Sequence, residues 1–241
     1  MSVFASLVEQ LTDLLRPLFG LSAAAAAIIA FTALVRLLVH PLSRAAARGQ
    51  KARAALQPRV AELRRKHGKN PEKLQRAVME LHAEEKVSPL SGCLPSLLQL
   101  PAFFLLYHLF SSGSIGGEPN ALLTHQLLDA PLGGRWADAL ADGGAFGGAG
   151  VVYLGLFAVV AVVAYFSYRL SRRMTEASAA TAGAGVDPQV PGAAAMGGVM
   201  KVMPFMSFFT LVTVAVVPLA AALYVVTSTT WSVIERSVLY R

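Results

Sequence analysis

The chain has 241 residues, of which 55% are hydrophobic and only 15% charged, and its formal net charge is +7. This composition excludes an ordinary soluble domain and predicts an all-α protein that crosses a membrane several times. The single cysteine, Cys93, excludes an intrachain disulfide and a metal site built from several cysteines.

Residues 1–18 are predicted to form an amphipathic helix that lies in the membrane interface on the extracytoplasmic side. Leucines recur there at spacings of three and four, whereas Glu9, Asp13 and Arg16 fall elsewhere on the helix. The segment has neither the basic leader nor the small-residue cleavage site of a secretory signal. The alternative is that this helix continues directly into the first membrane span.

Residues 19–40 are predicted to form the first span, because about 20 apolar residues cross the hydrocarbon core of a bilayer. One charged residue, Arg36, interrupts this apolar stretch. A guanidinium at that depth costs roughly 2.5–3.5 kcal/mol on insertion scales. Arg36 therefore predicts a functional site that faces either a partner carboxylate or a hydrated cavity.

Residues 41–90 predict a basic helical hairpin in the cytoplasm. The first arm is rich in helix-forming residues, and Pro58 is expected to bend it. Asn70 and Pro71 predict the N-cap and the first position of a second helix. The apolar stripe of the two arms is expected to be either a seam between them or a docking surface for a partner.

The rest of the chain predicts four more spans and a charge asymmetry between the loops. The expected segments are spans at 91–112, 150–169, 199–217 and 218–236, an outer loop at 113–149, and cytoplasmic segments at 170–198 and 237–241. Pro218 divides the last apolar stretch, which is too long for one span. The outer loop is acidic, whereas Lys and Arg dominate the hairpin and the residues after Tyr168. Because Lys and Arg are retained on the cytoplasmic side, the N-terminus is expected outside and the C-terminus inside.

Several polar residues fall within the predicted spans. Thr32 lies one turn before Arg36 and shares its helix face. Gln99 stands between two prolines, which remove backbone donors and bend the second span. Hydroxyls of the last span, Thr227 and Ser228 among them, are expected to bond within or between helices, or to line a hydrated concavity with Arg36. No Asp or Glu is expected to pair with Arg36 inside the membrane, so its counter-charge is expected to come from a bound segment.

Taken together, these motifs resemble the YidC/Oxa/Alb membrane protein insertases. The matching positions are Arg36 and Pro41, the step Leu56-Gln57-Pro58, the run Ser88-Pro89-Leu90, Gly92-Cys93, Pro95, Gln99 and Pro101, and finally Pro204, Pro218 and Leu223-Tyr224. The resemblance covers about residues 19–238. The chain departs from the family pattern where Ala220 or Ala221 stands for a common Gly, and where Thr227-Ser228 replaces a common Asn.

The resemblance implies five spans around a hydrophilic groove that is open to the cytoplasm and to lipid but closed on the outside. It makes Arg36 the positive charge of the groove and Thr32 its neighbour. It assigns Leu100, Phe103 and Tyr224 to contacts with a passing substrate helix. With Gln99, Thr227 and Ser228, these residues form the predicted site.

The implied function is that of a membrane protein insertase and chaperone. It takes transmembrane segments of newly made proteins from the cytoplasm and releases them laterally into the bilayer of a bacterial plasma membrane. The expected partners are nascent membrane proteins and lipid, with the Sec translocon, targeting factors and the ribosome as candidates for the hairpin. The chain is expected to act as a monomer and to bind no specific nucleic acid.

No zinc-protease, serine-hydrolase or phosphate-binding motif occurs in the sequence. We therefore predict that the chain is not an enzyme and uses no cofactor or metal. Two other function classes stay open at this point. One is a small transporter or channel that uses Arg36 as an anion site, and the other is a scaffold that assembles membrane complexes.

Overall fold

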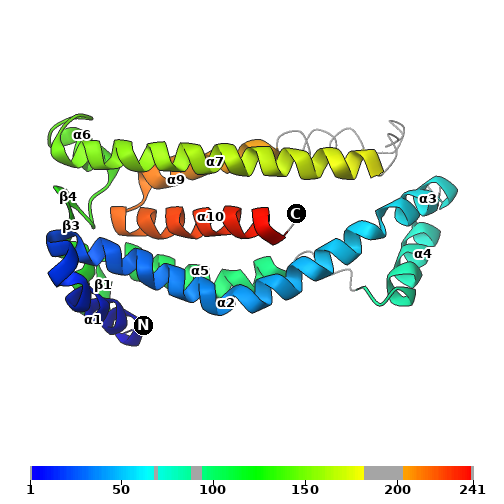
Figure 1. Cartoon of the computed structure of the whole chain (residues 1–241), viewed down its shortest axis with the longest axis horizontal. Helices are drawn as coiled ribbons and strands as arrows, with labels where there is room; N and C mark the ends of the chain where they lie inside the picture. The colour runs from blue at the N-terminus through cyan, green and yellow to red at the C-terminus, as the bar shows by residue number, and fades with distance from the viewer. Residues whose placement is uncertain (1, 68–69, 88–93, 182–202, 240–241) are drawn as a thin grey trace.

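The computed structural model describes residues 2–67, 70–87, 94–181 and 203–239. In this part of the chain nearly all regular structure is helical, and the only strands are four of two residues each. The long helices lie side by side, with α10 between a layer of α7 and α9 and a layer of α2 and α5 (Figure 1). The all-α prediction is thus confirmed in outline.

The N-terminal helix α1 (Ser2–Phe19) folds back onto α2 (Ala23–Ala55) through a 3-10 turn, η1 (Gly20–Ser22). Gly20 has a φ of 55°, in the left-handed region that only glycine enters readily. The reversal at this glycine lets α1 pack along α2, so α1 does not prolong the axis of the first span (Figure 1).

Helix α2 passes residue 40, where we expected the first span to end, and continues to Ala55. Pro41 lies inside the helix and removes one backbone donor. The Ala, Leu and Arg residues that follow are strong helix formers, and they keep the chain helical beyond the proline. Figure 1 shows that α2 is bent along its length, as expected for a helix that contains a proline.

Two helices, α3 (Gln57–His67) and α4 (Pro71–Glu84), contact each other beyond the end of α2. The Asn70 side chain accepts a hydrogen bond of 3.1 Å from the backbone N–H of Lys73, which confirms the predicted N-cap. The break in the first arm falls at Leu56 rather than at Pro58. Pro58 sits in the first turn of α3, where the missing N–H needs no partner.

Helix α5 (Leu94–Ser111) leads into an irregular loop that holds the small elements. These are β1 (Ser114–Ile115) paired with β2 (Glu118–Pro119), η3 (Ala121–Thr124), β3 (Gln126–Leu127) paired with β4 (Ala130–Pro131), and α6 (Trp136–Ala141). These elements and the α3–α4 pair lie at opposite ends of the molecule (Figure 1).

The remaining helices are α7 (Gly148–Thr181), η4 (Met203–Phe208), α9 (Phe209–Val216) and α10 (Leu219–Leu239). The predicted turn at Pro218 is confirmed between α9 and α10. Helix α7 continues past the expected end at residue 169, so part of the predicted 170–198 connection is helical, and residues 182–202 lie outside the described part. Helix α10 contacts α2, α5, α7 and α9, which makes it the central helix.

The start of α10 is capped by the loop that follows α5. The backbone N–H groups of Leu219 and Ala220 donate to the carbonyls of Gly134 and Leu132, each at 2.9 Å. The first turn of a helix leaves these donors without partners of its own. The Tyr153 hydroxyl on α7 also donates to the Gly134 carbonyl, at 2.6 Å, and so fixes the loop from a second helix.

Two stretches of the described residues are long and apolar enough to cross a membrane, Val3–Ala55 and Gly148–Arg173, and a shorter apolar helix covers Phe205–Val216. In the most apolar 18-residue segment of each stretch, only 39% and 22%, respectively, is buried within the protein. Core helices of soluble proteins bury their apolar surface, whereas these expose it, as helices in contact with lipid do.

Candidate functional site

Arg36 lies on α2 and faces α10. Its Nε donates a hydrogen bond of 3.1 Å to the Ser228 hydroxyl, and one terminal guanidinium nitrogen contacts the same oxygen. The contact is partly buried. The guanidinium thus has a neutral partner on the neighbouring helix, and the source of its counter-charge stays a prediction.

The other hydroxyls that we assigned to the site bond within their own helices. Thr32 is buried and donates to the carbonyl of Ile28 at 2.7 Å. Thr227 donates to the carbonyl of Leu223 at 2.8 Å. These bonds follow the local i−4 pattern that we had left open for threonines in the spans. Among the predicted site residues, Ser228 has a hydroxyl that contacts another helix.

Tyr224 joins α10 to α5 through its ring. Its centroid lies 6.1 Å from that of Phe103 and 5.9 Å from that of Phe110. The ring is buried, and the hydroxyl lies near Ser228 and Arg36, so Tyr224 borders the polar contact between α2 and α10.

Helix α5 presents an apolar surface beside Tyr224. Phe103 stacks on Tyr107 with a centroid distance of 5.7 Å, yet Phe103 and Leu100 stay 38% and 47% exposed. Two residues predicted for substrate contact thus leave much of their side chains accessible. Gln99 lies on α5 as well, but its side chain is outside the described set.

A second polar contact between α2 and α10 was missed by the sequence analysis. The Nδ1 atom of His40 lies 2.6 Å from the Oε1 atom of Glu235, whose side chain is only 11% exposed. His40 follows Arg36 by four residues, and Glu235 follows Ser228 by seven, so both contacts lie along one seam between the two helices. In the sequence, these spacings show that His40 shares a helix face with Arg36, and Glu235 with Ser228. They do not show that the two helices pack against each other.

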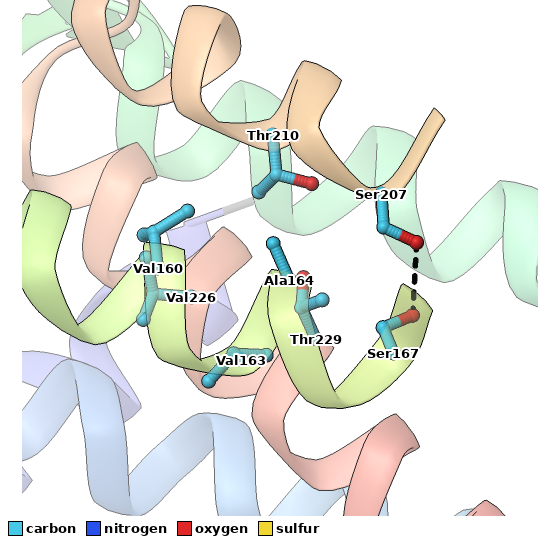
Figure 2. Close-up of a pocket in the computed structure, with 8 residues that line it drawn as sticks. All are labelled: Val160, Val163, Ala164, Ser167, Ser207, Thr210, Val226 and Thr229. Carbon is cyan, nitrogen blue, oxygen red and sulfur yellow. Dashed lines mark hydrogen bonds between the residues drawn. The ribbon is translucent and has the colours of Figure 1, made fainter. Parts of the chain in front are cut away.

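The cavity drawn in Figure 2 lies elsewhere, between α7, η4, α9 and α10. Its volume is about 30 Å³, which is room for about one water molecule. The hydroxyls of Ser167 and Ser207 point toward each other across its edge and are hydrogen-bonded at 3.1 Å (Figure 2). None of our predicted site residues lines it. The described residues also include no group of three His, Cys, Asp or Glu side chains that could hold a metal.

The polar seam between α2 and α10, beside the exposed apolar surface of α5, can be set against known proteins. A family model described as "60Kd inner membrane protein" matches residues 15–241. The chain belongs to this family. The 60Kd inner membrane protein assignment confirms the predicted resemblance to the YidC/Oxa/Alb group, because curated relatives carry the name membrane protein insertase YidC.

Three of these YidC relatives show how far the similarity extends. The Clostridium perfringens protein is 44% identical over 84 residues, which are 35% of this chain and 35% of the relative. The Anaeromyxobacter protein is 46% identical over 81 residues, 34% of this chain and 15% of the relative. The Polynucleobacter asymbioticus protein is 40% identical over 101 residues, 42% of this chain and 18% of the relative. The matches therefore span about a third or less of these relatives' own length.

The family description and the relatives' names also bear on two broader predictions. This is a membrane protein, as the composition predicted. The relatives are named as insertases and not after a catalysed reaction, which supports the prediction that the chain is not an enzyme.

Proposed function

We propose that this chain is a membrane protein insertase that takes transmembrane segments of newly made proteins from the cytoplasm and releases them sideways into lipid. The observation that supports this proposal most strongly is the Arg36–Ser228 contact between α2 and α10. It combines a permanent cation with an exchangeable neutral acceptor at a partly buried position.

The first step of the proposed mechanism is an exchange of partners at Arg36. A polar or acidic segment of the substrate enters along the seam and offers a carboxylate or a backbone carbonyl to the guanidinium. A carboxylate can accept two parallel hydrogen bonds from a guanidinium and adds the attraction between opposite charges, which a single neutral hydroxyl does not. A substrate carboxylate therefore displaces the Ser228 hydroxyl favourably and lowers the cost of moving the polar segment into the membrane.

The second step is the lateral release of the apolar segment. Leu100 and Phe103 of α5 offer exposed apolar contacts next to Tyr224. Transfer of the segment from water to lipid releases about 25 cal/mol per Å² of apolar surface. This transfer drives the process without any nucleotide bound to the chain.

We propose five spans, with α2, α5, α7, the η4–α9 segment and α10 crossing the bilayer. The basic α3–α4 pair would lie in the cytoplasm and the acidic loop after α5 outside, because Lys and Arg are retained inside. The N-terminus is then outside and the C-terminus inside, in a bacterial plasma membrane. The basic pair is the proposed contact for targeting factors, the ribosome or the Sec translocon, and the chain acts as a monomer.

Substitution of Arg36 tests the proposal in cells depleted of their own insertase. We expect Arg36→Ala to abolish insertion of single-span substrates with acidic N-terminal tails, and Arg36→Lys to retain most of it. A matched control is Arg135→Ala, which removes an exposed arginine from the outer loop. Normal insertion of all substrates by the Arg36→Ala variant would refute the partner exchange.

Crosslinking tests the release path independently of the charge. A photo-crosslinking residue at Leu100 or Phe103 is expected to capture a stalled nascent span, whereas the same residue at Phe166, which is exposed on α7, is not. Equal capture from all three positions would contradict a path along α5. Solute flux through the purified protein in liposomes would instead favour the transporter alternative, and a stable stoichiometric partner with tolerance of Arg36→Ala would favour the scaffold.

A further inference from the structure

A polar cavity lies at the loop end of the molecule, where the turn from α1 to α2 meets η3 and β3. Its volume is about 270 Å³, and its lining includes Arg16, Gly20, Thr124, His125 and Gln126. It is separate from the seam between α2 and α10. The proposed function gives it no role.

Three side chains that line the cavity carry N–H groups able to donate hydrogen bonds. The two threonines of the lining, Thr12 and Thr124, add no donor, because their hydroxyl protons go to the carbonyls of Val8 and Ala121, at 2.8 and 2.7 Å. The Arg16 guanidinium, the His125 ring and the Gln126 amide face the same space as groups able to donate. Such a set suits a phosphate, which accepts through all its oxygens.

A carboxylate stands next to the arginine. Asp13 Oδ1 lies 3.7 Å from a terminal nitrogen of Arg16, and their side chains are 72% and 63% exposed. An exposed pair of this kind is worth little, so it does not keep Arg16 from another anion. The guanidinium of Arg16 and the carboxylate of Asp13 are opposite in charge to the phosphate and the ammonium group of a zwitterionic headgroup.

The rim of the cavity is apolar in a way that suits lipid. Leu21 belongs to the lining and is 77% exposed. Leu128 is 64% exposed, and its backbone N–H donates to the Ser22 hydroxyl at 3.4 Å, which ties the β3–β4 turn to η1. Leu128 has a φ of 54°, a conformation that is uncommon for a leucine and costs energy. A polar cavity bordered by exposed leucines is the arrangement expected of a surface that sits among lipid headgroups.

From this combination we propose that the cavity binds the headgroup of a zwitterionic phospholipid of the phosphatidylethanolamine type. Arg16, with His125 and Gln126, holds the phosphate, and Asp13 faces the ammonium group. Leu21 and Leu128 contact the first carbons of the acyl chains. The site anchors the end of α1 to the membrane surface, and it does so whether or not the chain inserts other proteins.

The test measures binding of a fluorescent short-chain phosphatidylethanolamine to the full-length protein in detergent micelles. We expect saturable binding that Arg16→Gln weakens about fivefold, as loss of one exposed charge-assisted contact predicts. The control Arg135→Gln removes another exposed arginine, from the loop that follows α5, and leaves binding unchanged. A fluorescent diacylglycerol of the same chain length, which has no phosphate, is expected not to bind.

Further arms separate a lipid from a soluble anion. Leu128→Asn keeps a residue that tolerates positive φ but removes the apolar contact, so it weakens binding of the phospholipid and not of soluble glycerophosphoethanolamine. Competition by inorganic phosphate as effective as that by the lipid would assign the cavity to a free anion and overturn the proposal. Wild-type affinity of Arg16→Gln, with an unchanged circular dichroism spectrum, or binding of the diacylglycerol would overturn it as well.

Discussion

The two halves of the region where α2 meets α10 differ in what holds them together. Toward the loop that follows α5, both helices bury small apolar residues in one common core, with Ala24, Ala27 and Ala220 fully inaccessible. Toward the α3–α4 end, Arg36 and His40 on α2 meet Ser228 and Glu235 on α10. Small side chains let helix backbones approach closely and exclude water. Polar pairs instead hold helices through bonds that another polar group can replace.

This difference matters for function because it gives the bundle one closed half and one exchangeable half. The closed half is reinforced by the loop, whose carbonyls cap α10 at Leu219 and Ala220. The exchangeable half carries the residues to which we assign substrate capture. The following substitutions test the two halves against each other.

The largest effect is expected from enlarging an alanine in the closed half. Ala24→Leu overfills a fully buried position and should lower the free energy of unfolding by about 2–3 kcal/mol. The matched control is Ala30→Leu on the exposed face of the same helix, which should be nearly neutral. Unfolding by sodium dodecyl sulfate in mixed micelles, followed by circular dichroism, measures both. Similar losses for the two variants would mean that this half is not closely packed.

The next effect is expected at the polar seam. Ser228→Ala removes an acceptor from a partly buried cation and should cost about 1.5 kcal/mol in the same unfolding measurement. Thr230→Ala serves as the control, because Thr230 bonds only to the carbonyl of Val226 in its own helix. If Thr230→Ala destabilised the protein as much as Ser228→Ala, the interhelical bond would have no special weight.

A smaller effect is expected from releasing the loop. Tyr153→Phe keeps the ring that packs 5.8 Å from Trp136 but removes the hydrogen bond to Gly134. We expect the free energy of unfolding to fall by about 1 kcal/mol. We also expect faster amide hydrogen exchange at Leu219 and Ala220, whose N–H groups donate to carbonyls of the loop. Tyr165→Phe on the exposed face of α7 should change neither. Unaltered exchange in the Tyr153→Phe variant would show that the loop is held by other contacts.

The smallest effect is expected at the end of the seam. In a double-mutant cycle of His40→Ala and Glu235→Ala, we expect a coupling free energy of about 0.5 kcal/mol, since a third of the His40 side chain remains exposed. A matched cycle of His40→Ala with Arg236→Ala, whose side chain is exposed, should give no coupling. A coupling above about 1.5 kcal/mol, the loss expected for Ser228→Ala, would move the centre of the exchangeable half to His40.

Local sequence signals predicted the local features well. Asn70 followed by Pro71 predicts a capped helix start, and the hydrogen bond from Lys73 confirms it. Pro218 predicts the turn before α10 because a proline cannot continue the preceding helix. In both cases the deciding interaction lies within a few residues of the signal.

Features that depend on distant residues could not be predicted in the same way. The contact of His40 with Glu235 joins positions 195 residues apart, and no residue pattern in either segment indicates that the two helices pack together. The helix that carries the first predicted span continues past residue 40, because Pro41 removes only one donor while its neighbours favour the helix. Arg36 and Ser228 were placed in one predicted site from the sequence, but which hydroxyl of the last span contacts the guanidinium follows only from the packing of α10 against α2.

The unbroken course of α2 has a mechanical consequence. From Ala23 to Ala55 the helix comprises 33 residues, a rod of about 50 Å that carries Arg36 near its middle and α3 just beyond its tip. Pro41 makes the rod more compliant a little more than one turn past Arg36. A force applied to the α3–α4 pair therefore bends α2 at Pro41, so the part of the helix that carries Arg36 can keep its contact with α10 while the far end of the rod swings.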